Sequence, residues 1–96
     1  MATNKEVTDK AKEVLANTFT LYYKAHSYHW NVVGPDFYQL HDFFGHLYEE
    51  LHGAIDNLAE HVRQLDVFAP GNLAELLEYS TLEELDEGNV RFLHHK

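Results

Sequence analysis

The chain has 96 residues, enough for one domain, and it contains eight histidines but no cysteine. Disulfides, thiolate zinc sites, iron–sulfur clusters and cysteine nucleophiles are therefore excluded, so any metal must be held by imidazole and carboxylate. The formal net charge of −9 argues against a general nucleic-acid binder, and the 45% hydrophobic content argues against disorder.

The distribution of charge and of apolar residues bears on DNA and membrane binding. Residues 1–24 carry four lysines against three acidic side chains, a net charge of +1, whereas the rest carries three basic and 13 acidic residues, a net charge of −10. One surplus positive charge gives little basis for direct DNA binding. No apolar run approaches the roughly 20 residues that span a bilayer, and the first ten residues lack the apolar stretch of a signal peptide. We therefore expect a cytoplasmic protein that does not enter a membrane.

The first predicted helix spans about residues 4–33. Apolar and aromatic side chains recur there in steps of three and four, which is the period of an α-helix. Thr3 and Glu6 have the spacing of a capping box, so the helix should begin directly after Thr3. Gly34 and Pro35 end the pattern because proline cannot continue a helix.

The second predicted helix spans about residues 36–66 and shows the same spacing, with Asp36 placed to cap it. A proline–glycine pair then breaks the pattern. A short helical segment is expected at about residues 72–79, capped by Asn72, and residues 88–96 resemble a loose tail.

These elements predict an all-α fold, a long antiparallel helical hairpin. The apolar residues of its second helix cover a wide arc that must be buried against another element. We therefore expect at least a homodimer, in which two hairpins would most simply complete a four-helix bundle.

Four potential metal ligands lie on the predicted hairpin. His29 falls about five and a half residues before its midpoint and His41 about six and a half after it, so the two lie at nearly the same height. Asp56 and Glu60 are an i, i+4 carboxylate pair on the same face as His41, but Asp56 is about 22 Å further along the axis. One chain therefore cannot bring all four residues to one metal.

Two antiparallel copies can do so. If the second helix packs on its symmetry mate with the two-fold axis near residue 49, each of two equal sites receives His29 and His41 from one subunit and Asp56 and Glu60 from its partner. This ligand set suits iron (Fe2+/Fe3+), zinc or manganese better than magnesium or calcium, and open coordination positions would permit redox chemistry with iron.

Each residue also has an ordinary interpretation. A helical histidine is more often a hydrogen-bonded interface or surface residue than a ligand, and surface carboxylates at i, i+4 are common. His26 has two interpretations, a residue that supports the ligands or polar surface, of which we favour surface. We interpret Trp30 as a core or interface aromatic and His46 as an exposed ion-pair partner of Asp42. The convergence of four residues, more than any one of them, supports a metal site.

Four short sequence elements stand in a specific combination. They are residues 24–37 (KAHSYHWNVVGPDF), Gln39-Leu40-His41, Asp56-x-x-Ala59-Glu60-x-x-Arg63-x-Leu65 and Ala69-Pro70-Gly71. Over about residues 13–84 the combination resembles the Dps family, the mini-ferritins also known as DNA-binding proteins of starved cells. The resemblance implies a ferritin-like fold whose ferroxidase sites, between two-fold-related subunits of a twelve-subunit shell, oxidise ferrous iron, preferentially with hydrogen peroxide.

The resemblance carries over residue by residue. It implies that His29 and His41 are the two histidine ligands and that Asp56 and Glu60 are the carboxylates contributed by the partner chain. Trp30 matches the aromatic residue beside the site, where it is thought to quench radicals.

The sequence departs from the family pattern at two points. The family usually places an Asp or Glu four residues after the second histidine, where this chain has Gly45; His52 or a water could substitute, or the site could bind one metal weakly. The family also has four long helices, so residues 1–96 are predicted to be one truncated ferritin-like domain.

These observations favour ferroxidase-type iron binding, with oxidation of ferrous iron by peroxide or oxygen at intersubunit sites, in iron detoxification, storage and stress protection. The alternative is a non-catalytic helical assembly module derived from a ferritin-like protein.

Overall fold

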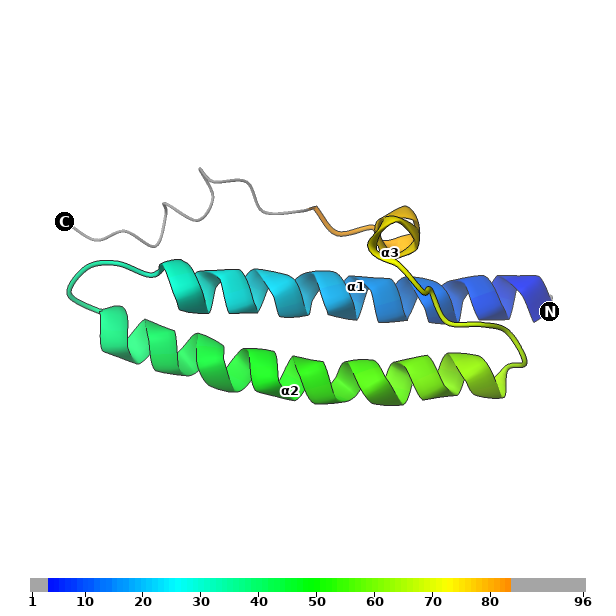
Figure 1. Ribbon diagram of the computed structural model, residues 1–96, viewed down its shortest axis with the longest axis horizontal. Coiled ribbons are helices and arrows are strands. Elements are labelled where there is room, and N and C mark those ends of the chain that lie inside the picture. The colour runs from blue at the N-terminus through cyan, green and yellow to red at the C-terminus, as the bar shows by residue number, and fades with distance from the viewer. Residues whose placement is uncertain (1–3, 84–96) are drawn as a thin grey trace.

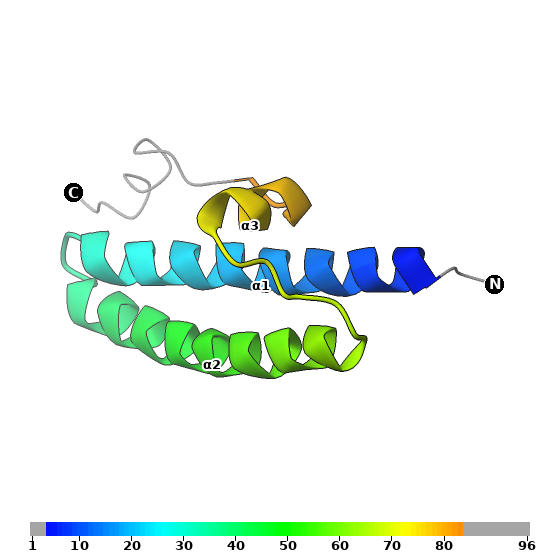
Figure 2. The same cartoon turned by 45° about the vertical axis from the view of Figure 1, so that its right-hand side comes forward.

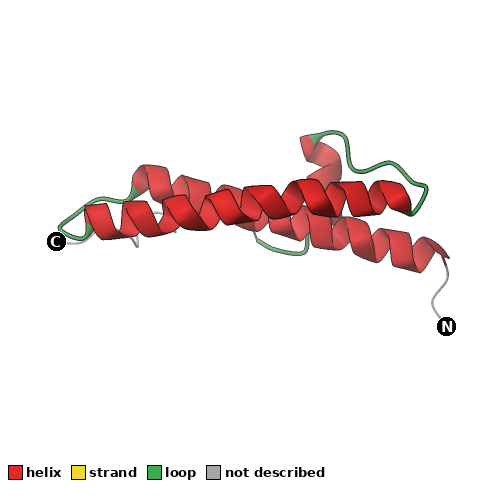
Figure 3. Cartoon of the chain, turned by 90° about the horizontal axis from the view of Figure 1, so that it is seen from below, coloured by secondary structure: helices red, strands yellow, loops and turns green. Residues whose placement is uncertain are grey.

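A computed structural model describes residues 4–83, which form three helices (Figure 1). Helices α1 (Asn4–Asn31) and α2 (Phe37–Gln64) run antiparallel, and the short helix α3 (Leu73–Tyr79) packs against α1. In Figures 1 and 2, α1 lies between α2 and α3. Figure 3 shows only helix and loop in the described part of the chain. The predicted all-α hairpin is confirmed for these residues, and the expected loose tail at 88–96 lies outside them.

The turn between the long helices depends on Gly34. Its φ of 105° is a backbone conformation that glycine adopts far more readily than other residues. The Phe37 N–H donates to the Gly34 carbonyl at 3.1 Å, which closes the turn directly before α2. Helix α1 ends at Asn31, two residues before the expected end.

The ends of α2 differ from the expected pattern. Asp36 occupies the N-cap position, but its side chain makes no capping hydrogen bond to the helix. At the other end, Asp66 adopts a left-handed φ of 66°, and its N–H donates to the Arg63 carbonyl at 3.0 Å. The helix therefore ends at Gln64, since a left-handed residue cannot continue a right-handed helix.

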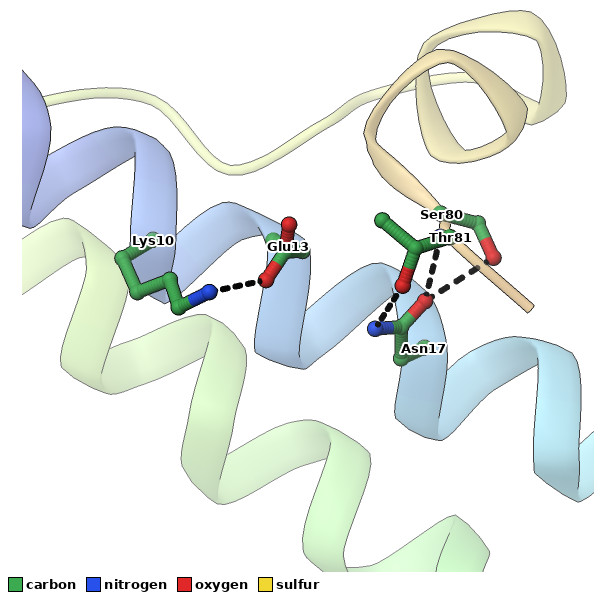
Figure 4. A network of polar contacts seen from close by, with 5 residues as sticks. All are labelled: Lys10, Glu13, Asn17, Ser80 and Thr81. Carbon is green, nitrogen blue, oxygen red and sulfur yellow. Dashed lines mark hydrogen bonds and ion pairs between the residues drawn. The ribbon is translucent and has the colours of Figure 1, made fainter.

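Helix α3 and the residues after it are fixed to α1 by side-chain hydrogen bonds. The predicted cap is confirmed, because the Asn72 side chain accepts the Glu75 N–H at 2.9 Å. Figure 4 shows Asn17 of α1 bonded to the segment that follows α3. Its Oδ1 accepts the Thr81 N–H at 2.7 Å and the Ser80 hydroxyl at 3.0 Å, while its Nδ2 donates to Thr81 Oγ1 at 2.9 Å.

The core of the described hairpin is small. The buried apolar side chains are Leu15, Ala16, Ala25, Val32 and Val62. Many larger ones stay exposed, among them Tyr38 at 81% and Phe68 at 79%. In residues 4–83, no helix combines the length and apolar character needed to cross a membrane. The exposed apolar area is large for so small a core, which favours burial against a further element.

Candidate metal centre

The expected pairing of His29 and His41 occurs within a single chain. The imidazole rings stack with centroids 3.6 Å apart and planes inclined by 21°. Both side chains are half-buried, His29 in the last turn of α1 and His41 in the second turn of α2. The turn at Gly34 thus brings the two rings together from neighbouring helices.

Each histidine is hydrogen-bonded to the backbone of the other. His29 Nδ1 lies 2.6 Å from the His41 carbonyl oxygen, and His41 Nδ1 lies 2.7 Å from the His29 carbonyl oxygen. A carbonyl can only accept, so both Nδ1 atoms must carry the proton. In the neutral imidazoles this leaves both Nε2 atoms with a free lone pair, the form in which histidine binds a metal.

A second cluster of rings adjoins the pair. His26 stacks on Tyr48 at 3.9 Å with planes inclined by only 6°, and its ring centroid lies 4.0 Å from that of Trp30. His26 Nδ1 is 3.3 Å from the Tyr22 hydroxyl. Partial burial lowers the pKa of His26 below 6.5, and neighbouring His29 and His52 lower it further. The prediction that His26 is surface is therefore wrong, because this half-buried ring joins α1 to α2.

Tyr48 connects the two clusters. Its ring meets that of His29 edge-on at 5.2 Å, so the contacts run without a break from Phe37 through both histidines and Tyr48 to His26 and Trp30. We call these six residues the ring stack. Trp30 stands at its end, 55% exposed, where a partner could cover it.

Asp56 and Glu60 lie elsewhere on α2. Both are exposed, and within residues 4–83 no group of three or more histidine or acidic side chains could hold a metal ion. The described chain thus brings together two of the four predicted ligands. His52 is also exposed, and its ring lies 5.4 Å from that of Tyr22. An exposed His46–Asp42 pair at 3.6 Å confirms the expected contact away from the site.

Tyr48 is a residue of the site that the sequence analysis did not single out. The argument that paired His29 with His41, equal distance from the hairpin midpoint, also applies to two tyrosines. Tyr22 lies about 12.5 residues before the hairpin midpoint and Tyr48 about 13.5 after it. Their ring centroids are 6.2 Å apart, so this signal could have placed Tyr48 beside the site.

The sequence was compared with models of known protein families and with known proteins. A family model described as a ferritin-like domain matches residues 8–92. The sequence is 43% identical over 74 residues to a DNA protection during starvation protein of Brevibacillus brevis, covering 77% of this chain and 50% of that one. The chain spans about half the length of the curated relatives it matches.

Solved structures give the same result. A Dps of Staphylococcus aureus matches with a TM-score of 0.84 and 31% identity, over 97% of this chain and 65% of that one. A Dps protein of Vibrio cholerae, described as a member of a broad superfamily of ferritin-like diiron-carboxylate proteins, matches with a TM-score of 0.82 and 27% identity, over 88% of this chain and 53% of that one. The resemblance expected from the four sequence elements is confirmed.

Proposed function

Because this chain belongs to the ferritin-like family, we propose that it binds ferrous iron at sites shared between two copies and oxidises it with peroxide or oxygen. The observation that carries the proposal is the pair of reciprocal Nδ1–carbonyl bonds between His29 and His41. These bonds fix both rings with their Nε2 lone pairs available, as hydrogen bonds to the opposite ring nitrogen do for metal-binding histidines.

The proposed site is completed by a second copy. Two antiparallel α2 helices, related by a two-fold axis near residue 49, would bring Asp56 and Glu60 of one copy opposite His29 and His41 of the other. Exposure of both carboxylates in the single chain leaves them accessible to such a partner. Two imidazoles and two carboxylates suit iron, with zinc and manganese as competitors.

The chemistry balances with ferrous iron as the reductant. Two ferrous ions transfer one electron each to one hydrogen peroxide, which takes up two protons and leaves as two waters. The carboxylates stabilise the ferric product, because its extra positive charge strengthens their attraction to the ion. Proposed roles are iron detoxification, storage and stress protection.

Direct DNA binding is not part of the proposal. Lys5 donates to Asp9 at 2.6 Å and Lys10 to Glu13 at 2.7 Å, while the Lys12 ammonium lies over the Tyr79 ring. Three of the four lysines in residues 1–24 therefore have partners in their own chain. Protection of DNA would follow from removing ferrous iron and peroxide.

One alternative function has its own support. Gly45 stands where the family usually has a carboxylate, so the chain could be a ferritin-derived assembly module without chemistry. Such a module would keep its oligomeric state in His29→Ala and Asp56→Ala variants and would retain no iron even as wild type.

Ferrous iron added anaerobically and followed by peroxide tests the proposal. We expect ferric absorbance to rise faster than in buffer, and the metal to co-elute with the protein on gel filtration. His29→Ala should lose at least tenfold in ferrous affinity, since a ligand is removed, whereas His46→Ala, which removes an exposed histidine, should match wild type. A wild-type rate equal to buffer with no retained metal would contradict the ferroxidase.

A further inference from the structure

Gly45 lies directly against the ring of His29. A Cβ placed on Gly45 would be 3.1 Å from His29 Cε1 and 3.2 Å from His29 Nδ1. Such contacts are tighter than ordinary van der Waals contact, so the ring would have to move. Gly53, eight residues further along α2, has nothing within 4 Å of the corresponding position. The two glycines of α2 therefore differ in their surroundings although they share a helix.

We propose that Gly45 is a positioning residue, whose missing side chain lets the His29 imidazole lie on α2 and donate to the His41 carbonyl. The same atom of His29 that a Cβ would approach, Nδ1, makes this 2.6 Å bond. The effect of Gly45 on iron binding rests on the proposed function. Its effect on the Nδ1-protonated tautomer of His29 depends only on the contacts described above.

The helix backbone connects Gly45 with this bond. In an α-helix the carbonyl of residue 41 accepts the N–H of residue 45, and its second lone pair is available to His29. A side chain at position 45 would thus stand beside the shared carbonyl and press on the His29 ring, whose Cε1 and Nδ1 would lie only 3.1 and 3.2 Å from its Cβ. Displacement of His29 would also disturb its stacking on His41, where the ring centroids are only 3.6 Å apart.

This geometry gives a different meaning to the departure from the family pattern. A carboxylate at position 45 could not simply be added to the observed arrangement, because its Cβ would push against His29. Glycine at position 45 therefore does more than remove a carboxylate ligand. It leaves room for the hydrogen bonds that hold His29 and His41 together.

A comparison of Gly45→Ala with Gly53→Ala tests the inference. Both changes add the same methyl group and the same helix propensity to α2. Gly53→Ala should raise the Tm by about 4 °C and leave the histidine ring signals unchanged. Gly45→Ala should not raise the Tm, should shift the His29 Nδ1–H signal in nitrogen-edited NMR of the metal-free protein, and should weaken ferrous binding about tenfold.

A double variant separates this effect from a general disturbance of the fold. In a His29→Ala background no ring opposes the added methyl group, so Gly45→Ala should now raise the Tm as Gly53→Ala does. The inference is overturned if Gly45→Ala gives the same His29 signal and the same Tm as Gly53→Ala. If wild type binds no iron, the proposed function fails, while the NMR and Tm comparisons still decide the role of Gly45.

Discussion

The ionisation of His26 follows from the residues around it. Its ring stacks on Tyr48 and contacts the tilted ring of Trp30, and its pKa is lowered by partial burial and by the neighbouring His29 and His52. A lowered pKa means that the folded protein favours neutral His26, whereas the unfolded chain takes up a proton near the ordinary value of 6.5. The contribution to stability is complete above about pH 6.5 and is lost as the pH falls through the folded pKa.

We therefore expect the Tm to fall when the pH is lowered from about 7.5 to about 5.5, with part of the slope due to His26. His26→Phe keeps an aromatic ring in the stack but cannot take up a proton, so its Tm should depend less on pH. His46→Ala serves as the control, because that side chain is exposed. A pH slope in His26→Phe equal to that of wild type would show that His26 does not titrate as described.

At the residue scale, sequence patterns located the histidine pair but not its surroundings. The equal heights of His29 and His41 followed from helix rise alone. The interleaving of His26 with Tyr48 and Trp30 depends on side-chain reach and rotamer, which helical periodicity does not determine. The close approach of the His29 ring to Gly45 was not predictable either, because the sequence shows only that Gly45 has no side chain.

At the scale of elements, the attachment of α3 to α1 depends on polar contacts between residues that are 60 or more positions apart in sequence. A seven-residue helix has little stability of its own, so α3 depends on its neighbours. Asn17 provides three hydrogen bonds to Ser80 and Thr81, and Thr20 adds a contact with the Ser80 hydroxyl at 2.9 Å. Local patterns predicted the helix and its cap, but no periodicity rule links positions so distant.

Asn17→Ala should loosen α3 while leaving the hairpin intact. Loss of three partly exposed hydrogen bonds should cost about 1–2 kcal/mol and speed amide exchange mainly in α3. Asn31→Ala is the matched control, since its side-chain amide donates to Ser27 of the same helix and, among residues 4–83, to no residue of α3. Equal exchange rates of α3 amides in the two variants would contradict the role of Asn17.

At the scale of the whole molecule, α2 has two faces of different composition. His41, Asp56 and Glu60 share one arc, whereas a leucine stripe occupies another. The stripe consists of Leu40, Leu47, Leu51, Leu58 and Leu65, all only half-buried in the described chain.

Helix α1 continues the apolar side of the hairpin. Val7, Val14 and Leu21 recur every seven residues and are each 44–45% exposed. An open groove of about 580 Å³ between the helices is lined by apolar residues including Val7, Val14 and Leu58. The need for a further packing partner was predictable from the width of this apolar arc, but its identity was not, since one chain contains no information on the contacts of another.

The central claim, that each site takes histidines from one copy and carboxylates from another, has a direct test. Two inactive variants, His29→Ala/His41→Ala and Asp56→Ala/Glu60→Ala, are co-expressed with different tags and purified as mixed dimers. In each mixed dimer one site regains all four ligands and the other has none, so ferrous oxidation should return to about half the wild-type level per dimer. Mixed dimers as inactive as the two parent variants would contradict the shared site.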